Sequence, residues 1–123
     1  CTGSLGAGHF NNLPAIAKEL APSIHFTHLR NLTRDSGLNF QEDTFFDGDI
    51  DMINVVKELV AEGYRREKET GEACLLPVRP DHGHQMLDDI GKENYPGYSL
   101  YGRMKNLAEI KGLTLGVIAM YIP

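Results

Sequence analysis

The sequence predicts an α/β protein with a parallel sheet. Segments with helical periodicity alternate with short runs rich in β-branched and aromatic residues, the order of elements that builds parallel sheets from βα units. Polar residues follow the predicted strands, and in such sheets functional groups gather at the carboxyl ends of strands. The 123 residues lie within the usual size of one domain, and neither a linker nor an internal repeat divides them.

Composition and charge narrow the classes of partner. Hydrophobic residues make up 41% of the chain and charged residues 24%, as in globular proteins. The net charge of -5 and the lack of a long Lys/Arg run argue against nucleic acid as a partner. The most apolar segment, residues 113–122, is about half the roughly 20 residues of a membrane span, so we expect it in the core and expect no membrane association. Cys1 and Cys74 lie 73 positions apart without a signal-like segment, which favours reduced thiols and a cytoplasmic location.

The first predicted elements are a helix and a strand. Asn12 is the predicted N-cap, and apolar residues recur at helical spacing until Pro22. Residues 24–29 then alternate in side-chain direction and are rich in β-branched and aromatic residues, which predicts a strand. On this strand His25 points away from His28, so we expect His25 to pack against the fold.

The middle of the chain combines a predicted loop with the strongest helix. Residues 31–48 show neither period and are rich in Asp, Asn, Gly and Thr, which predicts a long loop of a kind that is usually functional. Asp49 is the predicted cap of a helix that stops at Gly71. The side chains expected to face inward are Ile50, Ile53, Val56, Leu59, Val60 and Tyr64, and those expected to face water are Asp51, Asn54, Lys57, Glu58 and Glu62.

The last part of the chain repeats this order. An apolar run over residues 75–78 predicts a second strand, which is followed by a loop to Tyr98. A helix is expected from about Leu100, with Gly112 as its stop and an apolar helical tail behind it. Right-handed crossovers would place the carboxyl ends of the strands on one rim of the sheet.

Three potential metal ligands share this rim. Cys1, His28 and Asp81 each stand where a strand would end, and their separations of 27 and 53 positions are those of successive βα units. Thiolate, imidazole and carboxylate groups bind divalent transition metals. The pattern predicts a metal site, and purely structural roles for the same three residues are the alternative.

Five motifs, in order, resemble the C-terminal part of mannonate dehydratase. They are CTGSLG at residues 1–6, HFTHLRN at 25–31, DGDIDM at 47–52, RPDHGHQMLDD at 79–89 and NYPGY at 94–98. The resemblance spans nearly the whole chain and implies the C-terminal portion of a TIM (β/α)8 barrel of the xylose-isomerase-like type. Because a complete barrel takes roughly 250 residues, residues 1–123 would be the C-terminal βα units of a single barrel domain. The N-terminal part of that domain would be absent, and the chain would be the last third of the family's length.

The resemblance also implies an activity. The family consists of lyases that remove water from D-mannonate to give 2-dehydro-3-deoxy-D-gluconate, in hexuronate and glucuronate breakdown. The expected partners are therefore a small sugar acid and a second copy of the chain in a homodimer. The 123 residues alone are expected to be inactive and to aggregate, because fewer than half the strands of a barrel leave apolar edges and faces uncovered.

Carried over residue by residue, the resemblance assigns a site. Cys1, His28 and Asp81 correspond to ligands of Mn²⁺ or Fe²⁺, with a further histidine ligand in the absent N-terminal part. His82 and Tyr98 correspond to the acid/base pair. The chemistry needs two such groups because the C2 proton is weakly acidic and the C3 hydroxyl leaves poorly. Which of the two is the base stays open, since a histidine can serve either way and a tyrosine needs a nearby cation to act as a base.

Further residues are candidates for holding the substrate. Arg30 and Arg79 suit capture of a carboxylate, with pairing to a local acidic residue as the alternative. His84 either contacts substrate or hydrogen-bonds the loop. Two other tyrosines, Tyr95 and Tyr101, lie near the expected pair, and we expect Tyr101 in the core.

Two departures from the resemblance stand out. Relatives carry Phe-His-Glu and then a second histidine, where this chain has Gln41 and Phe45. If those histidines contact substrate, specificity or rate would differ here. Two other classes stay open at this point: another metal-dependent TIM-barrel enzyme, such as a sugar isomerase or epimerase, and a non-catalytic fragment of the dehydratase.

Overall fold

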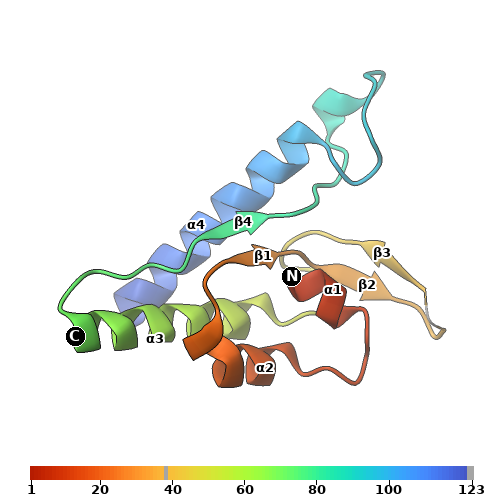
Figure 1. Cartoon of the computed structure of the whole chain (residues 1–123). Coiled ribbons are helices and arrows are strands. Elements are labelled where there is room, and N and C mark those ends of the chain that lie inside the picture. Colours follow the sequence, from red (N-terminus) through yellow and green to blue (C-terminus); the bar gives the residue numbers. More distant parts are fainter. Residues whose placement is uncertain (38, 122–123) are drawn as a thin grey trace.

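The computed structural model describes residues 1–37 and 39–121 and has mixed α/β structure (Figure 1), as the sequence predicts. The helices are α1 (Thr2–Gly6), α2 (Leu13–Leu20), α3 (Met52–Thr70) and α4 (Leu100–Tyr121), with short 3-10 helices η1 (Ala21–Ser23) and η2 (Leu87–Asp89). The strands are β1 (Thr27–Leu29), β2 (Leu32–Arg34), β3 (Phe40–Glu42) and β4 (Val78–Pro80).

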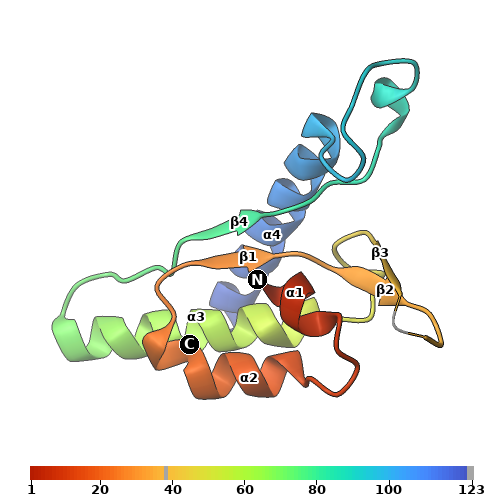
Figure 2. The ribbon, with the colours of Figure 1, turned by 45° about the vertical axis from the view of Figure 1, so that its right-hand side comes forward.

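The parallel strand pair expected from the βα alternation is present. β1 pairs with β4 in parallel, with His28 opposite Arg79, and α3 lies on the crossover between the two strands (Figure 2). Both strands are shorter than predicted, and β4 begins where residues 75–78 were expected to end. The paired stretch starts where the Thr27 amide donates to the Pro77 carbonyl (3.1 Å).

The segment predicted as a long loop, residues 31–48, contains an antiparallel hairpin, so that prediction is wrong. β2 pairs with β3 with Thr33 opposite Gln41. Buried Asn31 fixes the base of the hairpin: its amide donates to the carbonyls of Phe45 (2.9 Å) and Ile50 (3.0 Å), and its side-chain oxygen accepts from the amides of Leu32 (2.9 Å) and Ile50 (3.0 Å). These four hydrogen bonds satisfy buried backbone groups that have no partner in a strand or helix.

The ends of α2 and α3 follow their caps. Asn12 caps α2 as predicted, accepting from the Ala15 amide at 3.1 Å. The cap of α3 is Asp51 rather than Asp49, since Asp51 accepts from the amide of Asn54 at 3.0 Å while Asp49 binds Arg34. α3 ends at Gly71 as expected, in a left-handed conformation (φ 76°) that glycine adopts without strain.

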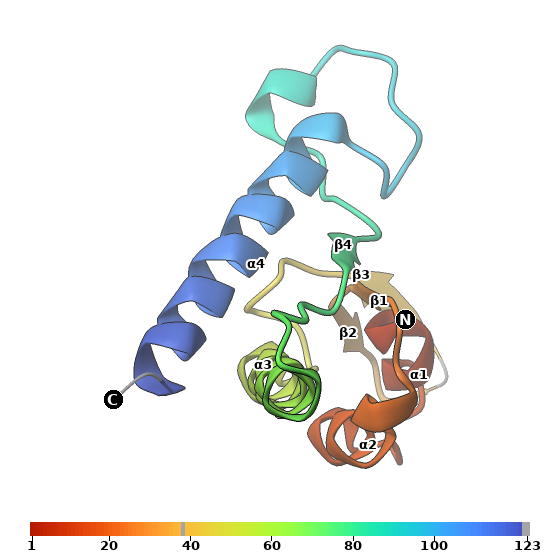
Figure 3. The ribbon, with the colours of Figure 1, turned by 60° about the vertical axis from the view of Figure 1, so that its left-hand side comes forward.

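The predicted inward face of α3 is largely confirmed, since Val56 and Leu59 are buried, but two residues differ from the prediction. Ile53, expected inside, is 54% exposed, whereas Met52 and Val55 are buried. Glu62, expected in water, is only 4% exposed and is paired with two arginines on its own helix. These two differences arise at the side of α3 along which α2 packs, which periodicity alone does not specify (Figure 3).

α4 runs through Gly112, so the predicted stop at that glycine is wrong. A mid-helix glycine costs about 1 kcal/mol relative to alanine, which a packed helix tolerates. The apolar tail at residues 113–122 is also not all core: Val117 is buried against α3, whereas Leu115 and Met120 are exposed, and Ile122 lies outside the described residues. Within residues 1–37 and 39–121, no helix is both long and apolar enough to cross a membrane.

The elements form two layers with a projecting arm. α2 and α3 lie side by side under the strands, α4 packs against α3 and β4, and the start of α4 projects together with the long loop before it (Figures 1 and 3). The core is made of buried apolar residues from α2, α3, α4, the strands and the segment after β3, among them Leu13, Leu29, Leu32, Phe45, Val55, Leu59 and Ile110. This packing brings the start of α1 and the ends of β1 and β4 to the same place.

Candidate metal centre

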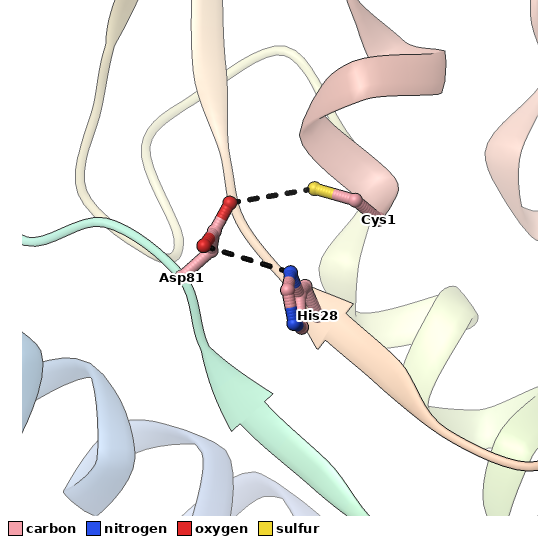
Figure 4. Close-up of side chains that lie close together, drawn as sticks. All are labelled: Cys1, His28 and Asp81. Atoms are coloured by element: carbon pink, nitrogen blue, oxygen red, sulfur yellow. Dashed lines mark hydrogen bonds and ion pairs between the residues drawn. The ribbon is translucent and has the colours of Figure 1, made fainter.

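Cys1, His28 and Asp81 converge in space, as the spacing predicts. Cys1 precedes α1, His28 lies in β1, and Asp81 directly follows β4. One ligand atom from each residue lies within 4.8 Å of the other two. Figure 4 shows the Asp81 carboxylate between the other two side chains, with its Oδ2 3.7 Å from the Cys1 Sγ and its Oδ1 3.5 Å from the His28 Nδ1.

These distances suit a shared cation. Two ligands of one ion with bonds of about 2.0–2.3 Å lie about 3–4.5 Å apart, so small side-chain movements bring all three groups into one coordination sphere. Thiolate, imidazole and carboxylate are also a donor set of transition metals rather than of calcium. The residues present therefore fit a divalent transition metal, and three protein ligands leave positions open for other ligands.

Local hydrogen bonds position Cys1 and His28. The Thr2 hydroxyl accepts from the Arg30 amide (2.8 Å) and donates to the Arg30 carbonyl (2.8 Å), which fixes the start of α1 against the end of β1. The Phe26 ring lies edge-on to the His28 ring, with centroids 5.2 Å apart. Cys1 itself is exposed, so the alternative of a buried structural cysteine is wrong.

A close approach of loop and helix positions Asp81. A Cβ added at Gly102 in α4 would lie 2.0 Å from the His84 carbonyl oxygen, and one at Gly83 would lie 2.4 Å from the Arg103 amide nitrogen. The loop that carries residues 81–84 therefore rests directly on the first turn of α4. Only glycine permits this contact, which holds Asp81 at the end of β4.

His82 and Tyr98 lie together beside the cluster. Their ring centroids are 4.6 Å apart, and the amide of Gly83 donates to the carbonyl of Gly97 at 2.8 Å, which joins the two loops. His82 Nδ1 lies 3.3 Å from the Asp81 Oδ2 but makes no hydrogen bond of good geometry with a described residue, although the atom is buried. Two groups able to exchange protons thus stand next to three potential metal ligands.

The three candidate substrate-binding residues differ in how strongly they are already paired with other residues. Arg30 is engaged with Glu42, whose carboxylate accepts from the Arg30 Nε at 2.9 and 3.0 Å and also contacts its Nη2. This hydrogen-bonded pairing raises the pKa of the Arg30 guanidinium above its ordinary value. Arg79 is more exposed, with its Nη2 3.5 Å from the Asp81 Oδ1. His84 Nε2 lies 2.5 Å from the Glu42 carbonyl oxygen, which can only accept, so this nitrogen carries the proton.

Several neighbouring residues lie outside the site. His25 is exposed rather than packed, so that expectation is wrong. Tyr101 is exposed as well, not in the core, with the Lys92 ammonium 5.1 Å from its ring centroid. Phe45, where the resemblance led us to expect a histidine, is 1% exposed within the core, and Gln41 pairs with Thr33 in the hairpin.

Glu42 is the residue that sequence reasoning missed. It contacts Arg30 and His84, and its Oε2 lies 3.7 Å from the His82 Nδ1. Residues 31–48 look like an irregular loop, and nothing in their periodicity reveals that the end of β3 faces the site. The sequence shows only that an acidic residue, Glu42, follows Arg30 further along the chain, and this does not reveal that the two are paired.

Three side chains that could hold a divalent metal ion therefore lie beside a histidine and a tyrosine, next to the parallel strands β1 and β4. Comparison with known proteins narrows the class of protein. A profile of the D-mannonate dehydratase family (UxuA) matches residues 1–122, and the chain belongs to that family. The resemblance noted in the sequence is therefore confirmed.

Curated relatives agree with the family profile. The chain is 47% identical over 116 residues to mannonate dehydratase 1 of Agrobacterium fabrum and 45% identical to the mannonate dehydratase of Rhizobium meliloti. It is 44% identical over 118 residues to the enzyme of that name from Chromohalobacter salexigens. These matches cover 92–95% of the chain but only 29–30% of each relative, so the chain spans under a third of their length.

Proposed function

We propose that the protein is a hydro-lyase that dehydrates D-mannonate to 2-dehydro-3-deoxy-D-gluconate with Mn²⁺ or Fe²⁺, in hexuronate and glucuronate breakdown. The observation that carries the proposal is the convergence of Cys1, His28 and Asp81 next to the His82–Tyr98 pair in a chain of this family. Dehydration of a sugar acid needs both parts: positive charge at the substrate carboxylate and two groups that move protons.

In this proposal Cys1, His28 and Asp81 hold the cation. When bound, the cation supplies the charge that offsets negative charge developing at the substrate carboxylate during loss of the C2 proton. The neighbouring Arg79 is the more exposed of the two candidate arginines and suits the same carboxylate, because the Arg30 guanidinium is already occupied by Glu42.

His82 and Tyr98 divide the proton transfers. One group takes the proton from C2, and the other gives a proton to the C3 hydroxyl, which leaves as water while the C2–C3 double bond forms. The resulting enol rearranges to the 2-keto product, so atoms and charge balance. The short separation of the two rings, with centroids 4.6 Å apart, supports this role, because coupled removal and donation of protons requires both groups near one small substrate.

We also propose that residues 1–123 are the C-terminal βα units of one TIM barrel. The β1–α3–β4 crossover followed by α4 is the repeating unit of such barrels, and site residues lie at the carboxyl ends of the strands, where barrel enzymes carry theirs. β1 and β4 pair only with each other within the described residues, so each has an edge on which a further barrel strand would fit.

The test is to incubate the full-length protein with D-mannonate and Mn²⁺ and to identify the product by mass spectrometry. The proposal predicts a 2-keto acid that has lost one water. A product of unchanged mass would instead indicate an isomerase or epimerase, and the absence of turnover with Mn²⁺ and with Fe²⁺ would contradict both readings. Omission of metal by chelation is the matched control.

A further inference from the structure

Glu42 stands at the centre of the contacts that order the site. From the end of β3 it reaches two candidate substrate residues and lies beside a candidate acid/base residue. We propose that Glu42 is a positioning residue: its carboxylate fixes the Arg30 guanidinium, and its backbone carbonyl fixes the His84 ring. This inference rests on the proposed dehydration and adds a residue to it.

The first argument is the geometry of the ion pair. Both Glu42 oxygens accept from Arg30 Nε, and Oε1 also contacts its Nη2, so the guanidinium is held by more than one hydrogen bond. The side chains are 12% and 21% exposed, and the Phe40 ring lies 5.5 Å from the guanidinium carbon. A planar fork held in this way has one orientation.

The second argument is what Glu42 touches beyond Arg30. Its carbonyl oxygen accepts from His84 Nε2 at 2.5 Å, and its Oε2 is 3.7 Å from the buried Nδ1 of His82. Its Cγ also lies 3.7 Å from the position that a Cβ on Gly97 would take, so it borders the turn that carries Tyr98. Glu42 therefore lies beside His82 and next to the turn that precedes Tyr98.

The consequence follows from charge. Without the carboxylate, the Arg30 guanidinium has no anion to hold it at the hairpin, and it becomes free to move toward the carboxylate of Asp81. The hairpin would keep its strand pairing, because Glu42 takes part in the β2–β3 ladder through backbone atoms. Glu42→Gln is thus expected to disturb the site more than the fold.

The experiment compares two variants of the full-length protein with D-mannonate and Mn²⁺. Glu42→Gln removes the ion pair at the site. The matched control, Asp49→Asn, removes the Arg34–Asp49 pair at the other end of the same hairpin, where Asp49 accepts from the Arg34 Nε at 3.1 Å. We expect Glu42→Gln to lower kcat about 10- to 100-fold with KM within about threefold, because positioning rather than binding is lost. The control should stay within about twofold of the wild type.

A second variant keeps the inference falsifiable. Glu42→Asp keeps the charge with a shorter reach, so its kcat should lie between those of the wild type and Glu42→Gln, at about one fifth of the wild type. If Glu42→Gln does not fold, the kcat of Glu42→Asp compared with that of Asp49→Asn tests the inference instead. Equal losses in the site and control variants, or wild-type kcat in Glu42→Gln, would overturn the inference. An inactive wild-type protein would instead overturn the proposed function.

Discussion

The two halves of the chain differ in how they combine packing with chemistry. Residues 1–70, the N-terminal unit, supply most of the buried apolar residues of the core, among them Leu29, Phe45 and Val55. Residues 71–121, the C-terminal unit, add Ile110 and Val117 to the same core but expose Leu75 (77%) and Leu87 (85%). Yet the proposed site takes residues from both units. Stability within the chain thus resides mainly in the first unit, while the second delivers reactive groups on loops.

The largest effect is expected at the ligand that the C-terminal unit supplies. Asp81→Asn removes the charge that lies between Cys1 and His28, so Mn²⁺ affinity should fall at least about 100-fold and turnover in proportion. Because Asp81 belongs to a loop, the thermal unfolding midpoint of the metal-free protein should stay unchanged. Metal binding by calorimetry on the full-length protein checks this, with exposed Asp88→Asn as the control. Unaltered Mn²⁺ affinity in Asp81→Asn would remove this residue from the ligand set.

A comparably large loss of activity is expected on removal of one of the two proposed proton-transferring groups. Tyr98→Phe keeps the ring against His82 but deletes the hydroxyl, so kcat should fall about 10²- to 10⁴-fold. Metal affinity should not change, since the hydroxyl is not among the three ligands. Steady-state kinetics test the variant, and Tyr95→Phe is the control because that side chain is well exposed. If both variants lose activity equally, Tyr98 has no special role.

The N-terminal unit is expected to respond in stability instead. The Glu62 carboxylate accepts from Arg65 Nε and Arg66 Nε, each at 2.6 Å, and Arg66 also donates to the carbonyl of Ala21 at 2.8 Å. Glu62→Gln should lower the free energy of unfolding by about 2 kcal/mol, between the values for exposed and buried pairs. Urea denaturation tests this against Glu67→Gln, an exposed position on the same helix.

The ion pairs of Glu62 also make the stability of the fold depend on pH. Hydrogen bonds from Arg65, then from Arg66, lower the pKa of Glu62 from its usual 4.5 to about 2. A carboxyl whose folded pKa lies below its unfolded pKa stabilises the fold above the unfolded value, and that contribution is lost as the pH falls through the folded value. The stability difference between wild type and Glu62→Gln should therefore shrink between about pH 4.5 and pH 2. A constant difference over this range would show that the charge is not its source.

The smallest expected effect concerns a helix end in the same unit. Asp51→Ala removes the cap that accepts from the Asn54 amide at 3.0 Å and should cost about 1 kcal/mol of unfolding free energy. Asp51→Asn keeps a capping oxygen and should cost less than half of that. Urea denaturation of both variants distinguishes the cap from the charge, and equal losses would contradict the capping role.

Sequence reasoning could predict the βα order and the convergence of Cys1, His28 and Asp81, the three proposed ligands. Strand ends in parallel sheets share a rim whatever lies between them, so the positions of His28 and Asp81 follow from topology. Caps with a side-chain acceptor and a glycine stop, such as Asn12 and Gly71, are local signals and were also predictable. Membership of the family was visible because several motifs stand in register.

The features that were not predictable depend on contacts distant in sequence. Asn31 organises the hairpin through Phe45 and Ile50, and no local period shows such bonds. The burial of Glu62 on α3 depends on contacts with the segment after α2, because its partner Arg66 donates to the carbonyls of Ala21 and Ile24. Gly112 continues α4 because neighbouring turns outweigh a weak local preference. Glu42 faces the site for the same kind of reason, since its strand register places it there.

The most direct test of the account is the position of the metal. Crystals of the full-length protein grown with Mn²⁺ should give one anomalous difference peak about 2.0–2.4 Å from the Cys1 sulfur, a His28 ring nitrogen and an Asp81 carboxylate oxygen together. A peak bound by other residues, or no peak between these three side chains at saturating Mn²⁺, would contradict the shared site on which the proposed dehydration depends.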